Sequence, residues 1–218
     1  MKEKMEKRKL WIFDLDGTLI DSVGGIVQSV NVTRKQYGFA PLPENLIVSY
    51  TGDGIAKLTE RSFADVGLPA SLNEVKSRME ENYKADPMFE TDLYEGVRET
   101  LETLHSKGYL LAVISNKPES VGKMILGNLN IMPLLCENIG GGRFPLKPAP
   151  DPINYLLEKY AVAKEDAMMV GDNHTDVNCG RNAGVKSCFC RYGFGTLDAT
   201  AADFEIDSFA ELLSLLEK

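Results

Sequence analysis

The stretch from Asp14 to Ser22, DLDGTLIDS, constrains what this chain can fold into more than any other. It places Asp14 and Asp16 directly after Leu10–Phe13, a short apolar run typical of a buried parallel strand. Aspartate is a poor strand former and costly to bury unpaired, so two of them at the end of a strand need a partner. A bound cation is the simplest partner, and Gly17 permits a tight turn close to a ligand. The alternative is a polar turn that binds nothing.

Charge and cysteine usage narrow the class of protein. The 218 residues include 24 Lys and Arg and 32 Asp and Glu, a net charge of −8 with both signs interspersed. This balance argues against nucleic acid or an anionic membrane as a partner and suits small ligands. No apolar run approaches the roughly 20 residues of a membrane span, and the N-terminus does not resemble a secretory signal. The four cysteines form no Cys-x-x-Cys pair, so we expect reduced thiols in a cytoplasmic protein of undetermined oligomeric state.

Two kinds of periodicity divide the chain. Between about residues 21 and 91, apolar residues recur at helical spacing over 23–37, 55–66 and 72–85, and Gly/Pro clusters separate these segments. From residue 93 onward the pattern alternates between helix and strand. Strands are expected over 109–115, 136–140, 167–170 and 185–190, with a short apolar piece near Phe204; helices are expected over 97–106, from Pro118, and over 151–160, 176–183 and 208–216.

Alternating strands and helices predict an α/β fold with a doubly wound, mainly parallel sheet. The first strand belongs to that sheet, so the helical block interrupts it as an insertion. We therefore expect a core of residues 1–20 and 92–218 and an α-helical cap of residues 21–91. Ligands of such sheets bind outside the carboxyl ends of the strands, where the cap begins.

Polar residues lie at three further places, at the end of a predicted strand or in a loop. Ser115 and Asn116 precede a helix, where they could seat an anion or simply cap the helix. Lys147 lies in a proline-rich loop that would fix its direction, although a lone lysine there is usually solvated. Asp172 and Asp176 could complete a magnesium site, or could offset the dipole of the helix that follows.

The ordered set resembles a known family. Asp14-Leu-Asp16-Gly-Thr, then Ser115, then Lys147 before Pro148, then Gly171-Asp172-x-x-x-Asp176 are similar to the four motifs of the haloacid-dehalogenase-like phosphatases. The helical block resembles the cap of the phosphoglycolate phosphatase and β-phosphoglucomutase branch. Phosphoglycolate phosphatases are the most similar, on Thr51–Gly54, Glu60-Arg61, Tyr94–Val97, Asn116–Pro118 and Tyr192-Gly193.

Some residues depart from the patterns of related enzymes. The β-phosphoglucomutases carry an acid where this chain has Gly171, which weakens a mutase reading. Dehalogenases lack the second aspartate of the first motif, so the presence of Asp16 disfavours carbon–halogen cleavage. The segment 140–144 lacks acidic residues often seen in phosphoglycolate phosphatases, which leaves the substrate open.

The resemblance implies magnesium-dependent hydrolysis of a phosphate monoester through an aspartyl-phosphate intermediate. Asp14 would be the nucleophile and Asp16 the general acid and base. Mg²⁺ would be held by Asp14, the Asp16 carbonyl and Asp172. The phosphoryl oxygens would contact Ser115, Asn116 and Lys147, and Asp176 would have a supporting role.

The cap is expected to set the substrate. Gly52 and Gly54 would let a turn approach bound substrate, and a helix beginning near Ile55 would aim its amides at an anion. A small metabolite such as 2-phosphoglycolate would suit this side of the site, and Arg61 or Lys57 could also contact it. The alternative is that the turn is a hinge without ligand contact.

Rival hypotheses are a phosphatase of pyrophosphate, sugar phosphates or nucleotides, a phosphorylation-controlled signalling module, and an inactive phospho-ligand binding protein.

Overall fold

The protein is built on a central parallel sheet. The structure, a computed structural model, describes residues 9–216. Six strands are ordered β5-β4-β1-β6-β7-β8, and every neighbouring pair is parallel. They are β1 (Leu10–Phe13), β4 (Leu110–Pro118), β5 (Glu137–Gly141), β6 (Ala167–Gly171), β7 (Lys186–Cys190) and β8 (Phe204–Ile206). The predicted α/β fold with a parallel sheet is confirmed.

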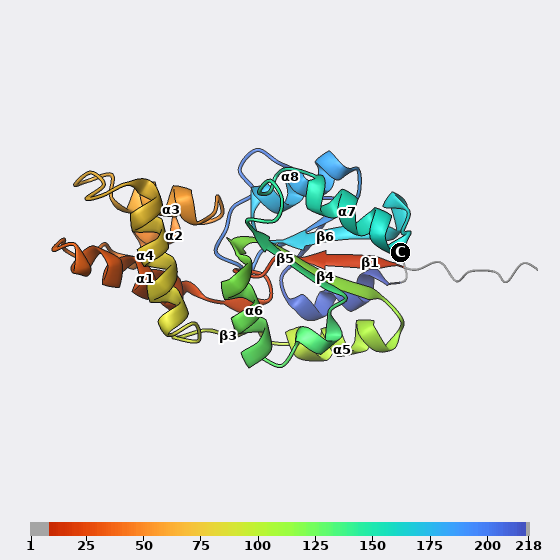
Figure 1. Ribbon diagram of the computed structural model, residues 1–218. Coiled ribbons are helices and arrows are strands. Elements are labelled where there is room, and N and C mark those ends of the chain that lie inside the picture. Colours follow the sequence, from red (N-terminus) through yellow and green to blue (C-terminus); the bar gives the residue numbers. More distant parts are fainter. Residues whose placement is uncertain (1–8, 217–218) are drawn as a thin grey trace, which may run out of the picture.

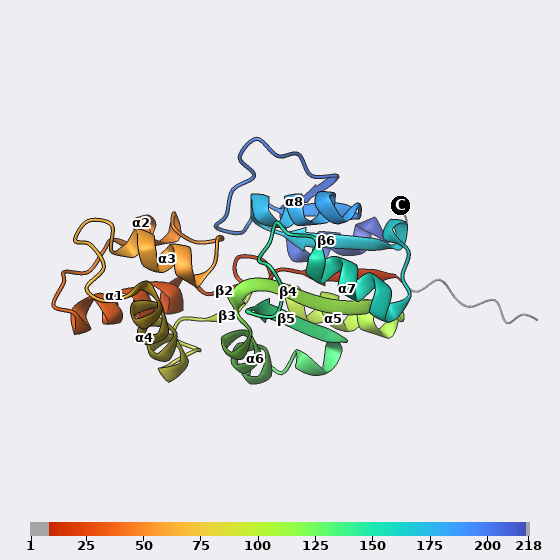
Figure 2. The ribbon, with the colours of Figure 1, turned by 45° about the horizontal axis from the view of Figure 1, so that its top comes forward.

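Helices cover both faces of the sheet, as Figures 1 and 2 show. Successive side chains of a strand point to opposite faces, so β1 sends Trp11 and Phe13 into one core and Leu10 and Ile12 into the other. The first core is closed by α5 (Val97–Ser106), α6 (Glu119–Asn128) and the 3₁₀ helix η3 (Phe209–Leu215). The second is closed by α7 (Asp151–Tyr160) and α8 (His174–Ala183). Two 3₁₀ turns, η1 (Met132–Leu134) and η2 (Lys164–Asp166), connect these elements.

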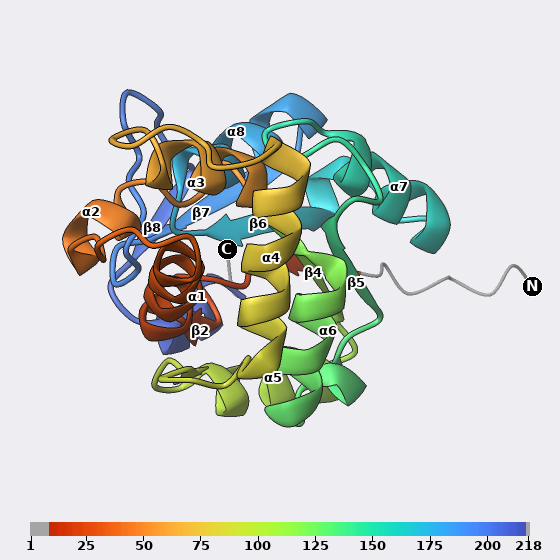
Figure 3. The same cartoon turned by 60° about the vertical axis from the view of Figure 1, so that its left-hand side comes forward.

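Four helices between β1 and β4 form a separate group, which we call the helical insertion. They are α1 (Val23–Gln36), α2 (Glu44–Val48), α3 (Ile55–Ser62) and α4 (Leu72–Ala85). The chain enters and leaves this group through β2 (Ile20–Asp21) and β3 (Asp92–Leu93), which pair antiparallel. In Figure 1 the arrow of β1 points toward the insertion, and Figure 3 shows α4 beside α6. The insertion therefore lies beyond the carboxyl ends of the strands.

A buried arginine ties the insertion together. Arg34 of α1 donates to both carboxylate oxygens of Asp65 at 2.8 Å and, from Nε, to the Ala40 carbonyl at 2.7 Å. Its guanidinium also lies over the rings of Phe39 and Phe63. This ion pair lowers the pKa of Asp65. One side chain thus joins α1 to the two loops that follow α1 and α3.

The elements differ from the predictions mainly at their ends. The helix expected over 55–66 stops at Ser62, and turns over residues 63–66 lead to Gly67, whose φ is +77°. The last helix is 3₁₀ rather than α. The two-residue strands β2 and β3 and the five-residue α2 were not predicted, because they are too short to show a period. Within residues 9–216, no helix combines the length and apolar character that a membrane crossing requires.

Candidate active site

Three carboxylates meet at the carboxyl edge of the sheet. Asp14 follows β1, Asp172 follows the adjacent β6, and Asp176 lies in the first turn of α8. Each contributes an oxygen to a group whose members all lie within 4.8 Å of one another. Because β1 and β6 are parallel and in register, residues just past both strands are brought together. The sheet topology, and not sequence proximity, builds this acidic cluster.

Lys147 is the cation of this cluster. Its ammonium lies 2.8 Å from Asp14 Oδ1 and 2.6 Å from Asp176 Oδ1, and it donates to the Ile114 carbonyl at 2.9 Å. All three of its donors are therefore used, and the side chain is buried. The alternative of a solvated lysine in the proline-rich loop is wrong.

Asp176 orients Lys147 and also caps α8. Its Oδ2 accepts a hydrogen bond from the Asn173 amide at 3.0 Å, as part of a capping box. A Cβ at position 171 would lie 2.2 Å from Asp176 Cγ, so the site has room only for Gly171. This contact gives a physical reason why no acid precedes Asp172 here.

Asp172 is held by the loop after β7. Its Oδ2 accepts hydrogen bonds from the amides of Phe194 at 3.1 Å and Gly195 at 2.7 Å. Side chains at Gly193 or Gly195 would collide with Asp172, since a Cβ would lie 2.3 Å or 2.5 Å from its atoms. This support was not predicted from the sequence, where the pair Tyr192-Gly193 is the one signal that points to it.

The cluster carries more negative charge than one lysine balances. Burial and the nearby charge of Asp176 raise the pKa of Asp14 to about 7, although Lys147 opposes the shift. Burial and the two neighbouring acids also raise the pKa of Asp172 well above its ordinary value. Burial lowers the pKa of Lys147, but Asp14 and Asp176 outweigh it and raise the pKa above the ordinary range. An oxygen-only donor set with excess negative charge fits Mg²⁺.

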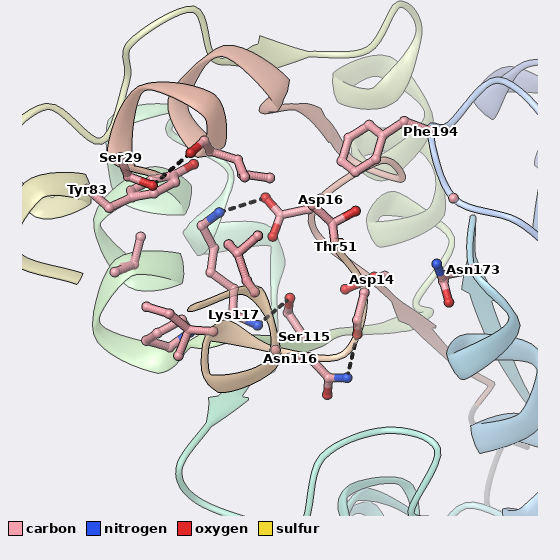
Figure 4. Close-up of a pocket in the computed structure, with 18 of the residues that line it drawn as sticks. Asp14, Asp16, Ser29, Thr51, Tyr83, Ser115, Asn116, Lys117, Asn173 and Phe194 are labelled. Atoms are coloured by element: carbon pink, nitrogen blue, oxygen red, sulfur yellow. Dashed lines mark hydrogen bonds and ion pairs between the residues drawn. The ribbon is translucent and has the colours of Figure 1, made fainter. Parts of the chain in front are cut away.

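Asp16 turns its carboxylate away from this cluster. Its Oδ1 accepts hydrogen bonds from Ser22 Oγ at 2.6 Å and from the Lys117 ammonium at 2.8 Å. Lys117 lies over the ring of Tyr83 in α4, with its ammonium 4.1 Å from the ring centroid. Figure 4 shows its side chain reaching up to Asp16. Sequence reasoning gave Lys117 no role, although it follows directly on Ser115-Asn116.

A register shift between β4 and β5 explains why three consecutive residues line the same cavity. β4 pairs with β5 up to Ile114 and again at Pro118, with a register shift between them. The residues in the irregular stretch, Ser115, Asn116 and Lys117, all line one cavity. The alternative that Ser115 or Asn116 caps α6 is wrong, because the N-cap residue is Pro118 and no side chain bonds there.

Asn116 joins the sheet edge to the insertion. Its Nδ2 donates to the Gly52 carbonyl at 2.8 Å and to the Lys147 carbonyl at 3.1 Å, while its Oδ1 accepts from the Lys147 amide at 2.8 Å. A Cβ on Gly52, where φ is +98°, would lie 2.9 Å from the side-chain nitrogen of Asn173. Gly52 therefore lies against two polar residues of the sheet edge.

A cavity of about 90 Å³ lies between the sheet edge and the insertion. Its floor, as we name it, consists of the sheet-edge residues Asp14, Asp16, Ser115, Asn116, Lys117, Asp172 and Asn173. Its roof consists of insertion residues, mostly apolar: Ile26, Ser29, Thr51, Gly52, Gly54, Ile55, Leu58, Met79, Glu80 and Tyr83.

Neither of the two basic helpers expected in the cap lines this cavity. Arg61 pairs with Asp53 at 2.6 Å and donates to the Tyr50 carbonyl, and Lys57 pairs with Glu60 on the surface. Both side chains therefore form ion pairs with acidic residues of the insertion and do not point into the cavity.

Comparisons with known proteins agree with this geometry. Residues 11–190 match the family model described as haloacid dehalogenase-like hydrolase. The chain belongs to the haloacid dehalogenase-like hydrolase family. Among relatives of this hydrolase are the phosphoglycolate phosphatases of Aquifex aeolicus, 33% identical over 94% of this chain and 95% of that protein, and of Haemophilus influenzae, 33% identical over 95% and 98%.

Solved structures give the same family assignment. A predicted phosphoglycolate phosphatase from Haemophilus somnus superimposes with a TM-score of 0.89 at 31% identity, covering 97% of this hydrolase and 99% of that chain. A haloacid dehalogenase-like protein from Streptococcus pneumoniae gives a TM-score of 0.83 at 27% identity, covering 95% and 98%. The prediction that this hydrolase is an enzyme, a phosphoric monoester hydrolase of the family, is confirmed.

Proposed function

We propose that this hydrolase is a magnesium-dependent phosphatase of small phosphorylated metabolites, with 2-phosphoglycolate as its substrate, and that it acts through an aspartyl-phosphate. The observation that carries the proposal is the convergence of Asp14, Asp172, Asp176 and Lys147 in one cluster, of which Asp14 and Asp172 line the cavity. Buried acids in excess of their counter-charge suit a site that receives a cation and a phosphoryl group. The names of the curated relatives support the choice of substrate.

Asp14 is the proposed nucleophile. Its carboxylate would attack phosphorus, form the aspartyl-phosphate and release the leaving alcohol, which splits one difficult displacement into two easier ones. Asp16 would protonate the departing oxygen and then take a proton from the attacking water. Ser22 and Lys117 hold Asp16 through Oδ1 only, which leaves Oδ2 for this proton transfer.

Ser115 and Lys147 would stabilise the phosphoryl oxygens. Negative charge spreads over these oxygens in the transition state, and a buried ammonium stabilises it without reorganising. Asp176 holds the ammonium of Lys147 at 2.6 Å and so fixes its position. Asn116 would contribute its backbone amide, because its side chain already bonds Gly52 and Lys147.

The residues that would hold Mg²⁺ are Asp14 and Asp172 through their carboxylates and Asp16 through its backbone carbonyl. When bound, the ion offsets the repulsion between the nucleophile and the phosphoryl oxygens. Asp176 would remain with Lys147 and the α8 cap.

We propose residues 21–91 as a cap that closes over the core of residues 1–20 and 92–218. The β2–β3 pair lies at both junctions and is the proposed hinge. In this structure Asn116 already bonds Gly52, so a closed arrangement would exclude water from the cavity. The four free cysteines support a reducing compartment such as the cytoplasm.

A substrate panel tests the proposal. The enzyme with Mg²⁺ should release inorganic phosphate from 2-phosphoglycolate faster than from glucose 6-phosphate, AMP or pyrophosphate, and chelation of the metal should stop it. A preference for one of the other three would reject the substrate. Absence of turnover on every ester, with and without metal, would reject the catalytic function in favour of a phospho-ligand binding module.

A further inference from the structure

We propose that Lys117 recognises the carboxylate of the substrate's leaving group and so determines specificity for a short, anionic phosphoester. This inference rests on the proposed function. Among the described residues of the roof, no basic side chain lines the cavity and could bind an anion. Arg61 and Lys57 are paired elsewhere, and the acid of the roof, Glu80, is paired with Lys84 at 2.6 Å.

Lys117 is the one basic residue among the cavity-lining residues of the described part of the chain. Lys147 belongs to the deeper cluster, where its three donors are taken by Asp14, Asp176 and Ile114. Lys117 is different, because its ammonium donates a hydrogen bond to Asp16 and otherwise lies against Tyr83. An ammonium has three donors, so Lys117 can serve Asp16 and still bind a second carboxylate.

The position of Lys117 matches the shape of 2-phosphoglycolate. Asp16 is the proposed donor to the ester oxygen, and Lys117 Nζ lies 2.8 Å from its carboxylate. In 2-phosphoglycolate the carboxyl carbon is separated from that ester oxygen by a single methylene. A cation adjacent to the general acid therefore lies where a carboxylate this close to the ester oxygen would extend.

The surroundings of Lys117 favour a strong interaction with an anion. Its side chain is 6% exposed, and the ring of Tyr83 lies 4.1 Å from Nζ. An ion pair in a partly desolvated site is stronger than one at the surface. Tyr83 belongs to α4, so the insertion takes part in holding the ammonium in place.

The test compares two substrates of similar size whose leaving groups differ in charge. In 2-hydroxyethyl phosphate a hydroxymethyl group replaces the carboxylate of 2-phosphoglycolate. We expect Lys117→Met to lower kcat/KM for 2-phosphoglycolate relative to 2-hydroxyethyl phosphate by about 10- to 100-fold, mostly through KM, since a hydrogen bond to a charged group is lost. Any effect on Asp16 acts on both substrates and cancels in the ratio.

Two further variants complete the experiment. Lys123→Met, which removes an exposed lysine paired with Glu119, should leave the ratio unchanged. Lys117→Arg should restore part of the preference. An unchanged ratio in Lys117→Met, with both substrates slowed equally, would overturn the inference and reduce Lys117 to a positioning residue for Asp16. Absence of magnesium-dependent turnover in the unmodified enzyme would instead overturn the proposed function.

Discussion

The floor and the roof of the cavity differ in the kind of side chain that lines them. Two floor residues, Asp14 and Asp172, form a buried cluster with Asp176 and Lys147, and strand ends and glycine-rich turns fix their positions. The roof consists mostly of apolar side chains from helices, and its acid Glu80 is paired with Lys84. A charged floor costs stability and suits chemistry, whereas an apolar roof excludes water and shapes the space for substrate. Lys117 joins the two, because it is a floor residue bonded to Asp16 and its ammonium lies over the ring of Tyr83 in the roof.

Removal of the proposed nucleophile should give the largest effect. Asp14→Asn keeps the size of the side chain, and we expect kcat to fall by at least about 10⁴-fold for every substrate, as for other nucleophile deletions. Circular dichroism should show an unchanged fold. The matched control, Glu102→Gln on α5, alters an exposed acid and should keep full activity. Retained magnesium-dependent turnover in Asp14→Asn would contradict the proposal that the reaction takes place on the floor residue Asp14.

Loss of Lys147, the cation of the acidic cluster, should give the next largest effect. Lys147→Met leaves Asp14 and Asp176 without their shared partner, so we expect kcat to fall by roughly 10²- to 10³-fold. Phosphate-release assays on 2-phosphoglycolate and on an aryl phosphate should show the same loss. The control Lys186→Met lies on the surface and should have no effect. A loss confined to one substrate would move Lys147 from catalysis to substrate selection.

A substitution that removes contacts within the insertion should affect the free energy of unfolding more than it affects turnover. Arg34→Met removes the bonds to Asp65 and to the Ala40 carbonyl, and we expect the free energy of unfolding to fall by roughly 3 kcal/mol. Urea unfolding measures this change, with the exposed Arg78→Met as control. Turnover per folded molecule should change less than 10-fold. A loss of chemistry as large as that of Lys147→Met would contradict the separation of floor and roof.

The smallest expected effect is a pH dependence of the stabilisation that Mg²⁺ gives to the folded protein. Metal-free folded protein keeps a proton on Asp14 up to about pH 7, while the unfolded chain releases it near pH 3.8. The folded state thus binds more protons between these values, so its stability falls as pH rises through this window. Mg²⁺ competes with that proton and should raise the unfolding temperature by more degrees at about pH 8 than at about pH 5.5. Thermal melts of wild type and Asp14→Asn test this; equal shifts at both pH values in wild type would contradict it.

The floor was more predictable from the sequence than the roof. Asp14 and Asp172 each follow an apolar strand and Ser115 ends the predicted strand 109–115. Parallel topology gathers strand ends at one edge, so their convergence follows from local patterns. Lys147 was placed by its order in the family motifs, since nothing local distinguishes it from a solvated lysine. Contacts across the cavity have no such signal. The stacking of Lys117 on Tyr83 joins residues 34 positions apart in different layers, and the pairing of Arg61 with Asp53 depends on the turn that precedes α3.

The most direct test asks which side chain receives the phosphoryl group. Enzyme that is turning over 2-phosphoglycolate with Mg²⁺ is quenched in acid, digested and analysed by mass spectrometry. The peptide that contains Asp14 should carry one phosphoryl group, and that group should be absent from Asp14→Asn and from enzyme chelated before substrate is added. A phosphoryl group on any other residue of an active enzyme, or none under conditions that retain other acyl phosphates, would contradict Asp14 as the nucleophile.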